Sequence, residues 1–317
     1  MSSPAPHPVR GVVALVSSYH PDDRLVAVCA ALRDQVDRVV VVDDGTGPDA
    51  DPTLTACTDA GAVVVRHPEN RGIGAALCTA AAHADGPDGP PAWYLTVDQD
   101  SVLPPGYVDA LLAAAAGARA AGLDPALVGP EHVEDVGRRV AGQHGDVLLG
   151  LEPLQSGLLV ATDLPPAAGG GPVDAGLFID GVDTELWLRA RTAGRAVVVA
   201  PGTRIGHRLG TTTGAVGGRG PRLVHAAPFR YYYITRNRVH LLRRYGRRAP
   251  GWAVTAVLRD LRHLAVTGLL VPGRAARGRA ILRGAADGLR GVVGPDPARA
   301  TTRTPTPRPE HDVPHEH

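Results

Sequence analysis

Short apolar runs alternate with segments of helical periodicity along the first hundred residues. Residues 11–18 (GVVALVSS) form an apolar run that ends in small polar residues, which is typical of a buried parallel strand. Residues 22–36 follow with apolar positions at helical spacing after an acidic start. The alternation continues, with strands expected at RVVVVDDG, AVVVRHPEN and AWYLTVDQDS and helices at TLTACTDAG and GIGAALCTAAAHA. This repetition predicts an α/β fold with an open, mostly parallel sheet and helices on both faces.

The remaining segments extend this pattern. Residues 104–122 read as a helix, FIDGVDTELWLRARTAG as an acidic turn leading into a helix that ends at Gly194, and VVVAPG as a strand. Residues 229–245 and 251–291 look helical and Arg-rich. We therefore expect a disordered N-terminus (1–8), an α/β domain (9–228), an Arg-rich helical C-terminal region (229–294) and a disordered tail (295–317).

Composition narrows the class of protein. The chain has 317 residues, of which 44% are hydrophobic and 21% charged, as is ordinary for a soluble globular protein. No apolar run reaches the roughly 20 residues that span a bilayer. The three cysteines are widely spaced, which disfavours a zinc module or a disulfide scaffold. The first ten residues lack the apolar core of a signal peptide, so we expect a cytoplasmic protein.

The net charge of +1 conceals an asymmetry. Residues 1–203 carry 12 Arg against 26 acids, whereas residues 204–290 carry 18 Arg against only Asp260 and Asp287. The basic segment is either a solvated helical face or a surface that meets anions, such as substrate phosphates or lipid headgroups. Nucleic acid is disfavoured, because no nucleic-acid-binding motif is present and aromatic residues make up only 4% of the chain.

Acidic residues follow the fourth predicted strand. In open α/β sheets ligands gather at the carboxyl ends of the strands. Asp98 and Asp100, separated by Gln99, follow a strand that is apolar up to Val97. Carboxylates two residues apart can face one cation, and hard divalent cations prefer carboxylate and phosphate oxygens. The sequence therefore predicts a site for a divalent cation and a diphosphate.

Polar residues also follow the first three strands. Ser17 ends the first strand, and Asp43 and Asp44 end the second. The two aspartates either cap the next helix or accept from a nucleobase imide and a ribose hydroxyl. After the third strand, Gly72 permits close approach of backbone, and Asn70 is explained equally well as a helix cap or as a binding residue.

Three acids crowd the start of a later helix. These acids, Asp180, Asp183 and Glu185, have three possible roles. They are stabilised by the helix dipole, or they pair with Arg189 one turn later, or one of them is a general base that takes the proton of a sugar hydroxyl. His207 lies in a Gly/Thr-rich loop and is either an ordinary surface residue or a third metal ligand.

Taken in order, these segments resemble the inverting family 2 glycosyltransferases of the GT-A fold. Within that family the chain is most similar to bacterial rhamnosyltransferases that use dTDP-L-rhamnose. The similarity covers about residues 11–245. Its segments are VSSYHPD, VVVVDDGT, HPENRGIGAA, LTVDQDS, LQSGLLV, FIDGVDTELWLRARTAG, IGHRLG and FRYYYITRN.

The resemblance implies a donor site and a metal. Asp43 and Asp44 would lie at the base and ribose, and Asp98 and Asp100 would form a DxD motif, with Asp100 the firmer ligand of Mn²⁺ or Mg²⁺. His207 would complete the metal site. The other implied donor-site residues are Ser17, Asn70, Gly72, Gln99, Gln155, Ser156 and Gly157, with Arg236 and Asn237 at the diphosphate or an acceptor phosphate.

The resemblance also implies a catalytic base. Asp183 matches that base, and Glu185 matches a second acid that helps to bind the acceptor. Val182 stands where the family often has an acid, while Asp180 lies three residues before Asp183. The base is therefore Asp183 or Asp180, and we favour Asp183.

The implied reaction moves L-rhamnose from dTDP-L-rhamnose to a hydroxyl of a glycan or lipid-linked saccharide, as in cell-wall polysaccharide synthesis. The alternatives are a galactofuranosyl- or other hexosyltransferase that uses a UDP-sugar, and a non-catalytic sugar-nucleotide-binding protein. Residues 204–290 would then meet the cytoplasmic face of a membrane, with 251–271 either an interfacial helix or a helix packed on the catalytic domain.

Overall fold

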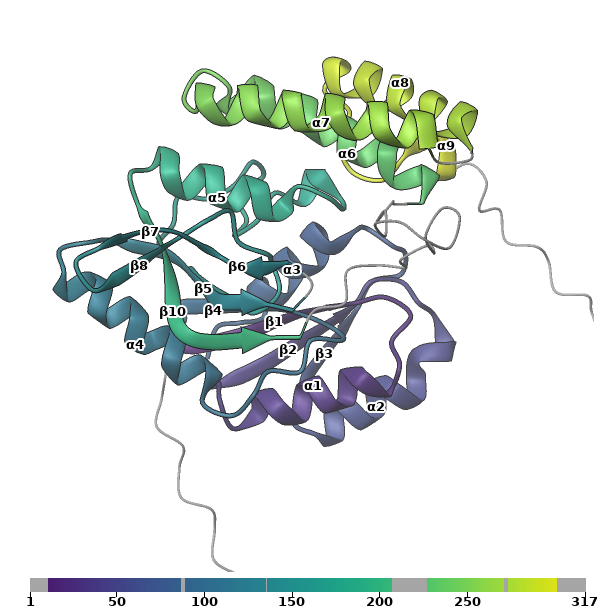
Figure 1. Cartoon of the computed structure of the whole chain (residues 1–317). Coiled ribbons are helices and arrows are strands. Elements are labelled where there is room, and N and C mark those ends of the chain that lie inside the picture. The colour runs from purple at the N-terminus through teal and green to yellow at the C-terminus, as the bar shows by residue number, and fades with distance from the viewer. Residues whose placement is uncertain (1–10, 87–88, 135, 207–226, 271–272, 301–317) are drawn as a thin grey trace, which may run out of the picture.

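The computed structural model describes residues 11–86, 89–134, 136–206, 227–270 and 273–300, which form a mixed β-sheet with helices around it (Figure 1). The described strands are β1 (Val12–Ser18), β2 (Arg38–Asp43), β3 (Val63–Arg66), β4 (Trp93–Asp98), β5 (Pro125–Val133), β6 (Gly137–Arg138), β7 (Val140–His144), β8 (Val147–Gly150), β9 (Leu158–Ala161) and β10 (Ala196–Ile205). Their order in the sheet is β3-β2-β1-β4-β9-β5-β10-β8-β7, with β6 paired to β5.

The parallel core of the sheet confirms the predicted fold class. β1 lies between β2 and β4 and is parallel to both, so that Ser18 is opposite Asp43 and Ser17 is opposite Asp98. This register brings the carboxyl ends of the strands to one edge, as expected. The other half of the sheet is mixed, because β9 runs antiparallel between β4 and β5, and β8 runs antiparallel to β10. The sequence analysis did not anticipate these antiparallel strands.

Helices cover both faces of the sheet. The face that carries Val12, Ala14 and Val16 packs against α1, α2 and α4, and the face that carries Val13 and Leu15 packs against α3 and α5. Strands buried on both faces explain the unbroken apolar runs. The described helices are α1 (Asp23–Arg33), α2 (Asp51–Asp59), α3 (Ile73–Ala82), α4 (Tyr107–Ala120), α5 (Val182–Thr192), α6 (Pro228–Tyr245), α7 (Pro250–Leu270), α8 (Arg274–Arg290) and α9 (Pro297–Ala300), with 3₁₀ turns at Pro48–Ala50 and Ala175–Leu177.

The C-terminal helices lie together beside α5 (Figure 1). Leu188 of α5 packs with Leu241 and Tyr245 of α6, which fixes this helical layer on the α/β part. α8 approaches α6 closely, because a Cβ at Gly284 would lie 2.4 Å from the carbonyl oxygen of Tyr232. The predicted helix over 251–291 is two helices, α7 and α8.

Part of the predicted disordered tail is ordered. The backbone N–H of Asp296 donates to the Tyr233 hydroxyl over 2.7 Å, and its carboxylate pairs with Arg283. The expectation of disorder from Pro295 is therefore wrong for residues 295–300, whereas the boundary at 228/229 stays a prediction. No helix among the described residues is long and apolar enough to cross a membrane.

Candidate active site

A cavity of about 650 Å³ opens where β1 and β4 end and α5 begins. The alignment of the parallel strands and the entry of α5 bring together residues that are far apart in the sequence. Of the predicted site residues, those that line this cavity are Ser17, Asp44, Asn70, Gly72, Asp98, Gln99, Asp100, Gln155, Asp180 and Asp183.

The DQD segment after β4 is held by contacts with the end of β1. The backbone N–H of Tyr19 donates to Gln99 Oε1 over 2.8 Å, and Gln99 Nε2 donates to the carbonyl of Tyr19 over 3.2 Å. The Asp98 N–H donates to Ser156 Oγ over 3.0 Å. Gln99 and Ser156 therefore fix the backbone of the segment, and the carboxylates of Asp98 and Asp100 line the cavity.

Asp44 organises the loop after β3. Its carboxylate accepts from the backbone N–H groups of Arg71, over 2.9 Å, and Gly72, over 2.7 Å, and His67 Nδ1 lies 2.8 Å from the same side chain. These bonds set the loop that carries Asn70 along the cavity wall. A structural role of Asp44 is thus visible in addition to its predicted place at the nucleotide.

Two predicted contacts fall behind the cavity wall. Asp43 is 0% exposed, bonds to Thr46 and lies 3.6 Å from Arg66, so its carboxylate does not line the cavity, and its contact with the base and ribose stays a prediction. Gly157 adopts φ +74° and its N–H donates to the carbonyl of Thr96 over 2.8 Å. Like Ser156, it shapes the wall without lining the cavity.

Three buried polar atoms of the cavity have no hydrogen-bond partner among the described residues: Ser18 Oγ, Asn70 Oδ1 and Gln155 Nε2. Buried polar atoms are nearly always paired, so such atoms in a cavity are the ones that a polar ligand would satisfy. The sequence analysis named Asn70 and Gln155 and missed Ser18. The serine pair at the end of the first apolar run was the available signal.

Asp183 has the properties of a base. Burial, together with charge repulsion from the carboxylates of Glu152 and Asp180, raises the pKa of its carboxyl to about 6. The Thr184 N–H donates to its Oδ1 over 2.8 Å and opposes this shift. A carboxylate with such a pKa is ionised at neutral pH and more basic than an ordinary aspartate.

Asp180 is paired. Arg230 Nε donates to Asp180 Oδ2 over 3.2 Å and the guanidinium forms a second bond to the other oxygen. Because Arg230 engages both carboxylate oxygens of Asp180, the geometry favours Asp183 as the base. Arg230 also lines the cavity and was missed by the sequence analysis, although it lies in the FRYYYITRN segment that carries the resemblance.

The acidic turn is strained and held by α6. Phe178 and Asp180 adopt φ of +65° and +64°, and non-glycine residues rarely adopt such values. Asn237 Nδ2 donates to the carbonyls of Leu177, Ile179 and Asp180, and Arg236 donates to the carbonyls of Gly176, Leu177 and Gly294. Arg236 and Asn237 are 0% and 1% exposed. Their donors are occupied by the turn and neither residue lines the cavity, and their contact with a phosphate stays a prediction.

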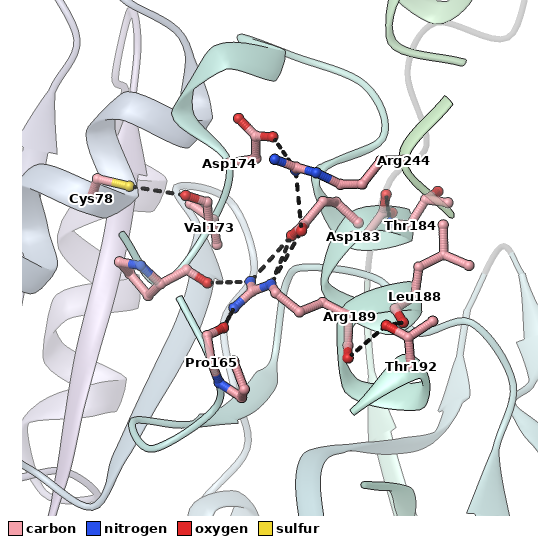
Figure 2. Close-up of polar contacts among 12 residues, drawn as sticks. Cys78, Pro165, Val173, Asp174, Asp183, Thr184, Leu188, Arg189, Thr192 and Arg244 are labelled. Atoms are coloured by element: carbon pink, nitrogen blue, oxygen red, sulfur yellow. Dashed lines mark hydrogen bonds and ion pairs between the residues drawn. The ribbon is translucent and has the colours of Figure 1, made fainter. Parts of the chain in front are cut away.

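Glu185 is also turned away from the cavity. It is 0% exposed, pairs with Arg189 at 3.1 Å and accepts from the Tyr245 hydroxyl over 2.7 Å. Arg189 in turn donates to the carbonyl of Pro165 (Figure 2). The internal pairing of Glu185 with Arg189 is thus confirmed, and its contact with an acceptor stays a prediction.

The described part of the predicted metal site is a pair of carboxylates. No cluster of three or more His, Cys, Asp or Glu that could hold a metal ion occurs among the described residues, and His207 lies outside them. Asp98 and Asp100 reach the same cavity, and their oxygens are the type of ligand that Mn²⁺ or Mg²⁺ takes. The residues present therefore fit a hard divalent cation.

Comparison with known proteins agrees with this architecture. Residues 14–147, less than half of the chain, match the family model described as Glycosyl transferase family 2. A structure of GalNAc-T7 with UDP, GalNAc and Mn²⁺ is similar with a TM-score of 0.50 and 12% identity, covering 71% of this chain and 47% of that one. The protein thus has a GT-A-like fold.

Two structures of S. aureus TarS are similar as well. TarS 1-349 in complex with UDP-GlcNAc has a TM-score of 0.49 and 16% identity, covering 88% of this chain and 92% of that one. A second TarS structure has a TM-score of 0.49 and 15% identity over 73% of this chain, which spans only 39% of that TarS chain. A comparison with curated protein sequences finds no match.

Proposed function

We propose that the protein is an inverting glycosyltransferase that moves a sugar from a nucleoside diphosphate to an acceptor hydroxyl. One observation carries this proposal: Asp183, with its raised pKa, lines the same cavity as the carboxylates of Asp98 and Asp100. This arrangement provides a base on one side and a place for a charged leaving group on the other.

The reaction is a single displacement. Asp183 takes the proton of the acceptor hydroxyl as its oxygen attacks the anomeric carbon from the face opposite the nucleotide. The bond between the anomeric carbon and the diphosphate oxygen breaks in the same step, and the nucleoside diphosphate leaves with the electron pair. Asp183 then loses the proton to solvent. A base with a pKa near 6 suits this step at neutral pH.

Negative charge grows on the diphosphate as it leaves. A divalent cation held by Asp98 and Asp100, with His207 as the third proposed ligand, supplies Lewis-acid stabilisation of that charge. Arg230 adds a positive charge to the same wall of the cavity. Ser18, Asn70 and Gln155 offer the unpaired polar atoms that the donor would meet.

The donor that we propose first is dTDP-L-rhamnose, because the motif segments resemble rhamnosyltransferases. A donor panel of dTDP-L-rhamnose, UDP-galactofuranose and UDP-GlcNAc with Mn²⁺ or Mg²⁺, read by nucleotide release, tests this. Fastest release from dTDP-L-rhamnose supports the proposal. Faster release from a UDP-sugar overturns the donor, and nucleotide binding without release from any donor indicates a non-catalytic protein.

We also propose that α7 binds an anionic membrane surface. Val254, Val257, Leu258 and Leu261 recur at helical spacing and are 39–61% exposed. Arg259 and Arg262 are exposed on the same helix. An apolar stripe flanked by arginines is complementary to the acyl and anionic headgroup layers of a membrane.

A further inference from the structure

A second cavity, of about 590 Å³, lies between α5, the start of α7 and the segment that joins β8 to β9. Its volume is in the range of small-molecule sites. None of the site residues discussed so far lines it except Glu152, whose carboxylate raises the pKa of Asp183.

The charge of this cavity is strongly positive. Arg139, Arg191, Arg248 and Arg259 line it, and none of them forms an ion pair within the described part of the chain. Glu152 is the one acid among the lining residues, and it accepts from the Thr184 hydroxyl. Unpaired guanidinium groups around a concave wall favour a phosphate or a carboxylate, which arginine binds with two parallel hydrogen bonds.

Two indoles form the apolar part of the wall. Trp187 of α5 and Trp252 of α7 line the cavity, and the Nε1 atom of each is buried with no hydrogen-bond partner among the described residues. The Nε atom of Arg139 is likewise buried with no hydrogen-bond partner among the described residues. Buried tryptophan N–H groups usually find an acceptor, and the indole face packs well on the C–H face of a pyranose ring. Arg191 and Arg238 lie over the Trp187 and Trp252 rings at 4.9 and 5.5 Å, so what the wall offers a sugar is chiefly the free N–H donors beside these cations.

The cavity borders the proposed base. Glu152 raises the pKa of Asp183 by direct charge repulsion, and Asp183 stabilises the charged form of Arg139. Thr184, the neighbour of Asp183 in the chain, is bonded to Glu152. A ligand in this cavity would therefore lie beside Glu152, which is bonded to the neighbour of the base.

We propose that this second cavity binds the acceptor and that the acceptor is an anionic saccharide carrying a phosphate or a carboxylate group. This assignment rests on the proposed glycosyl transfer and adds the chemical class of the acceptor. The guanidinium groups bind the anionic group, and Trp187 and Trp252 bind the sugar ring beside it.

Tryptophan fluorescence provides the test, because the chain has three tryptophans and the third, Trp93, is buried in the sheet at 2% exposure. Glucose 1-phosphate, glucuronate and methyl glucoside are titrated into the full-length protein. We expect the two anionic sugars to change the fluorescence and the neutral one to bind about tenfold more weakly or not at all. Tighter binding of glucose 1-phosphate assigns a phosphate-bearing acceptor, and tighter binding of glucuronate a uronic acid.

Variants locate the binding. The double variant Arg191→Ala/Arg248→Ala should weaken binding of the anionic sugars about tenfold or more, whereas Arg247→Ala, an exposed arginine outside the cavity, should not. Trp93→Phe should keep the fluorescence change, and Trp187→Phe/Trp252→Phe should lose it. Thermal stabilisation by the sugar nucleotide, measured on the same variants, should be unchanged.

The two proposals fail in different ways. Equal binding of neutral and anionic sugars, or binding unaffected by the double arginine variant while sugar nucleotides still bind, overturns the acceptor assignment alone. Absence of sugar-nucleotide binding by the unmodified protein overturns the proposed function instead.

Discussion

The side-chain amide of Asn237 donates a hydrogen bond of 2.7 Å to the backbone carbonyl of Asp180. The same nitrogen donates to the carbonyls of Leu177 and Ile179. Left-handed conformations such as that of Asp180 cost about 1–3 kcal/mol each and persist only when surrounding contacts hold them. The position of the acidic turn thus depends on α6, a helix that is remote from it in the sequence.

Asn237→Asp tests this dependence with a side chain of the same size. The carboxylate cannot donate, so the carbonyls of Ile179 and Asp180 lose the Asn237 donor and that of Leu177 keeps only Arg236, and we expect the free energy of unfolding to fall by about 2 kcal/mol. The turn that carries Asp183 should shift, which lowers kcat about tenfold or more while the donor KM stays unchanged. Urea unfolding and steady-state kinetics measure the two effects. An unchanged kcat would show that Asn237 does not position the base.

The base assignment is tested by replacing the two acids separately. Asp183→Asn should lower the rate of sugar transfer by about 10²–10⁴-fold, because the amide cannot take the acceptor proton. Asp180→Asn should have a smaller effect, because it weakens only the ion pair with Arg230. Folding should be retained, since Asp183→Asn removes a buried charge whose ionisation is unfavourable. Transfer assays measure the rates, and thermal unfolding checks that both variants fold. A larger loss of rate in Asp180→Asn than in Asp183→Asn would make Asp180 the base.

Much of the α/β part could be predicted because its strands and helices follow from the hydrophobic pattern of short segments. The apolar runs of β1, β2 and β4 are buried on both faces, and each ends in polar residues at the sheet edge that ligands use. From that alone one can expect Asp98, Asp100 and Asn70 to share a cavity. The strands from β5 to β9 escaped prediction. β5 is interrupted by Gly129 and Pro130, the others are only 2–5 residues long, and β7 is largely exposed, so no clear alternation forms.

Three of the motif residues lie outside the cavity for another physical reason. Arg236, Asn237 and Glu185 have the residue types of a phosphate and acceptor site, and their motif positions agree with that role. Whether such a side chain faces a cavity or a neighbouring helix depends on how α5, α6 and the acidic turn pack. That packing is tertiary, and the positive φ of Phe178 and Asp180 has no clear signal in the sequence.

Gly72, in the loop after β3, packs against the acidic turn. It adopts φ +91°, and a Cβ there would lie 2.4 Å from the carbonyl oxygen of Phe178. Gly72→Ala should therefore displace the turn and lower sugar transfer about a hundredfold. Gly137 has the same φ with no atom near its Cβ position, so Gly137→Ala carries the backbone strain alone and is the matched control. Equal transfer rates in the two variants would contradict the role of this contact.

The exposed stripe of α7 predicts membrane binding that depends on anionic lipid. Flotation with vesicles containing phosphatidylglycerol should recover the protein, and neutral vesicles should not. Leu258→Glu/Leu261→Glu should abolish recovery, because it places charges where acyl chains would lie. Val63→Glu, at an exposed apolar residue of β3 that lines neither cavity, is the control. Recovery that is insensitive to the α7 substitutions would remove the membrane proposal.

The raised pKa of Asp183 sets the pH dependence of transfer. The base acts when ionised, so the rate should rise with pH and level off above about pH 6, falling about tenfold for each unit below that. Glu152→Gln keeps an acceptor for the Thr184 hydroxyl but removes a negative charge that raises this pKa. Its acidic limb should therefore move to lower pH. Because burial is the larger cause, the midpoint should stay above that of an ordinary aspartate. A limb that does not move, measured from pH 4.5 to 8 under saturating donor, would mean that a group other than Asp183 controls the rate.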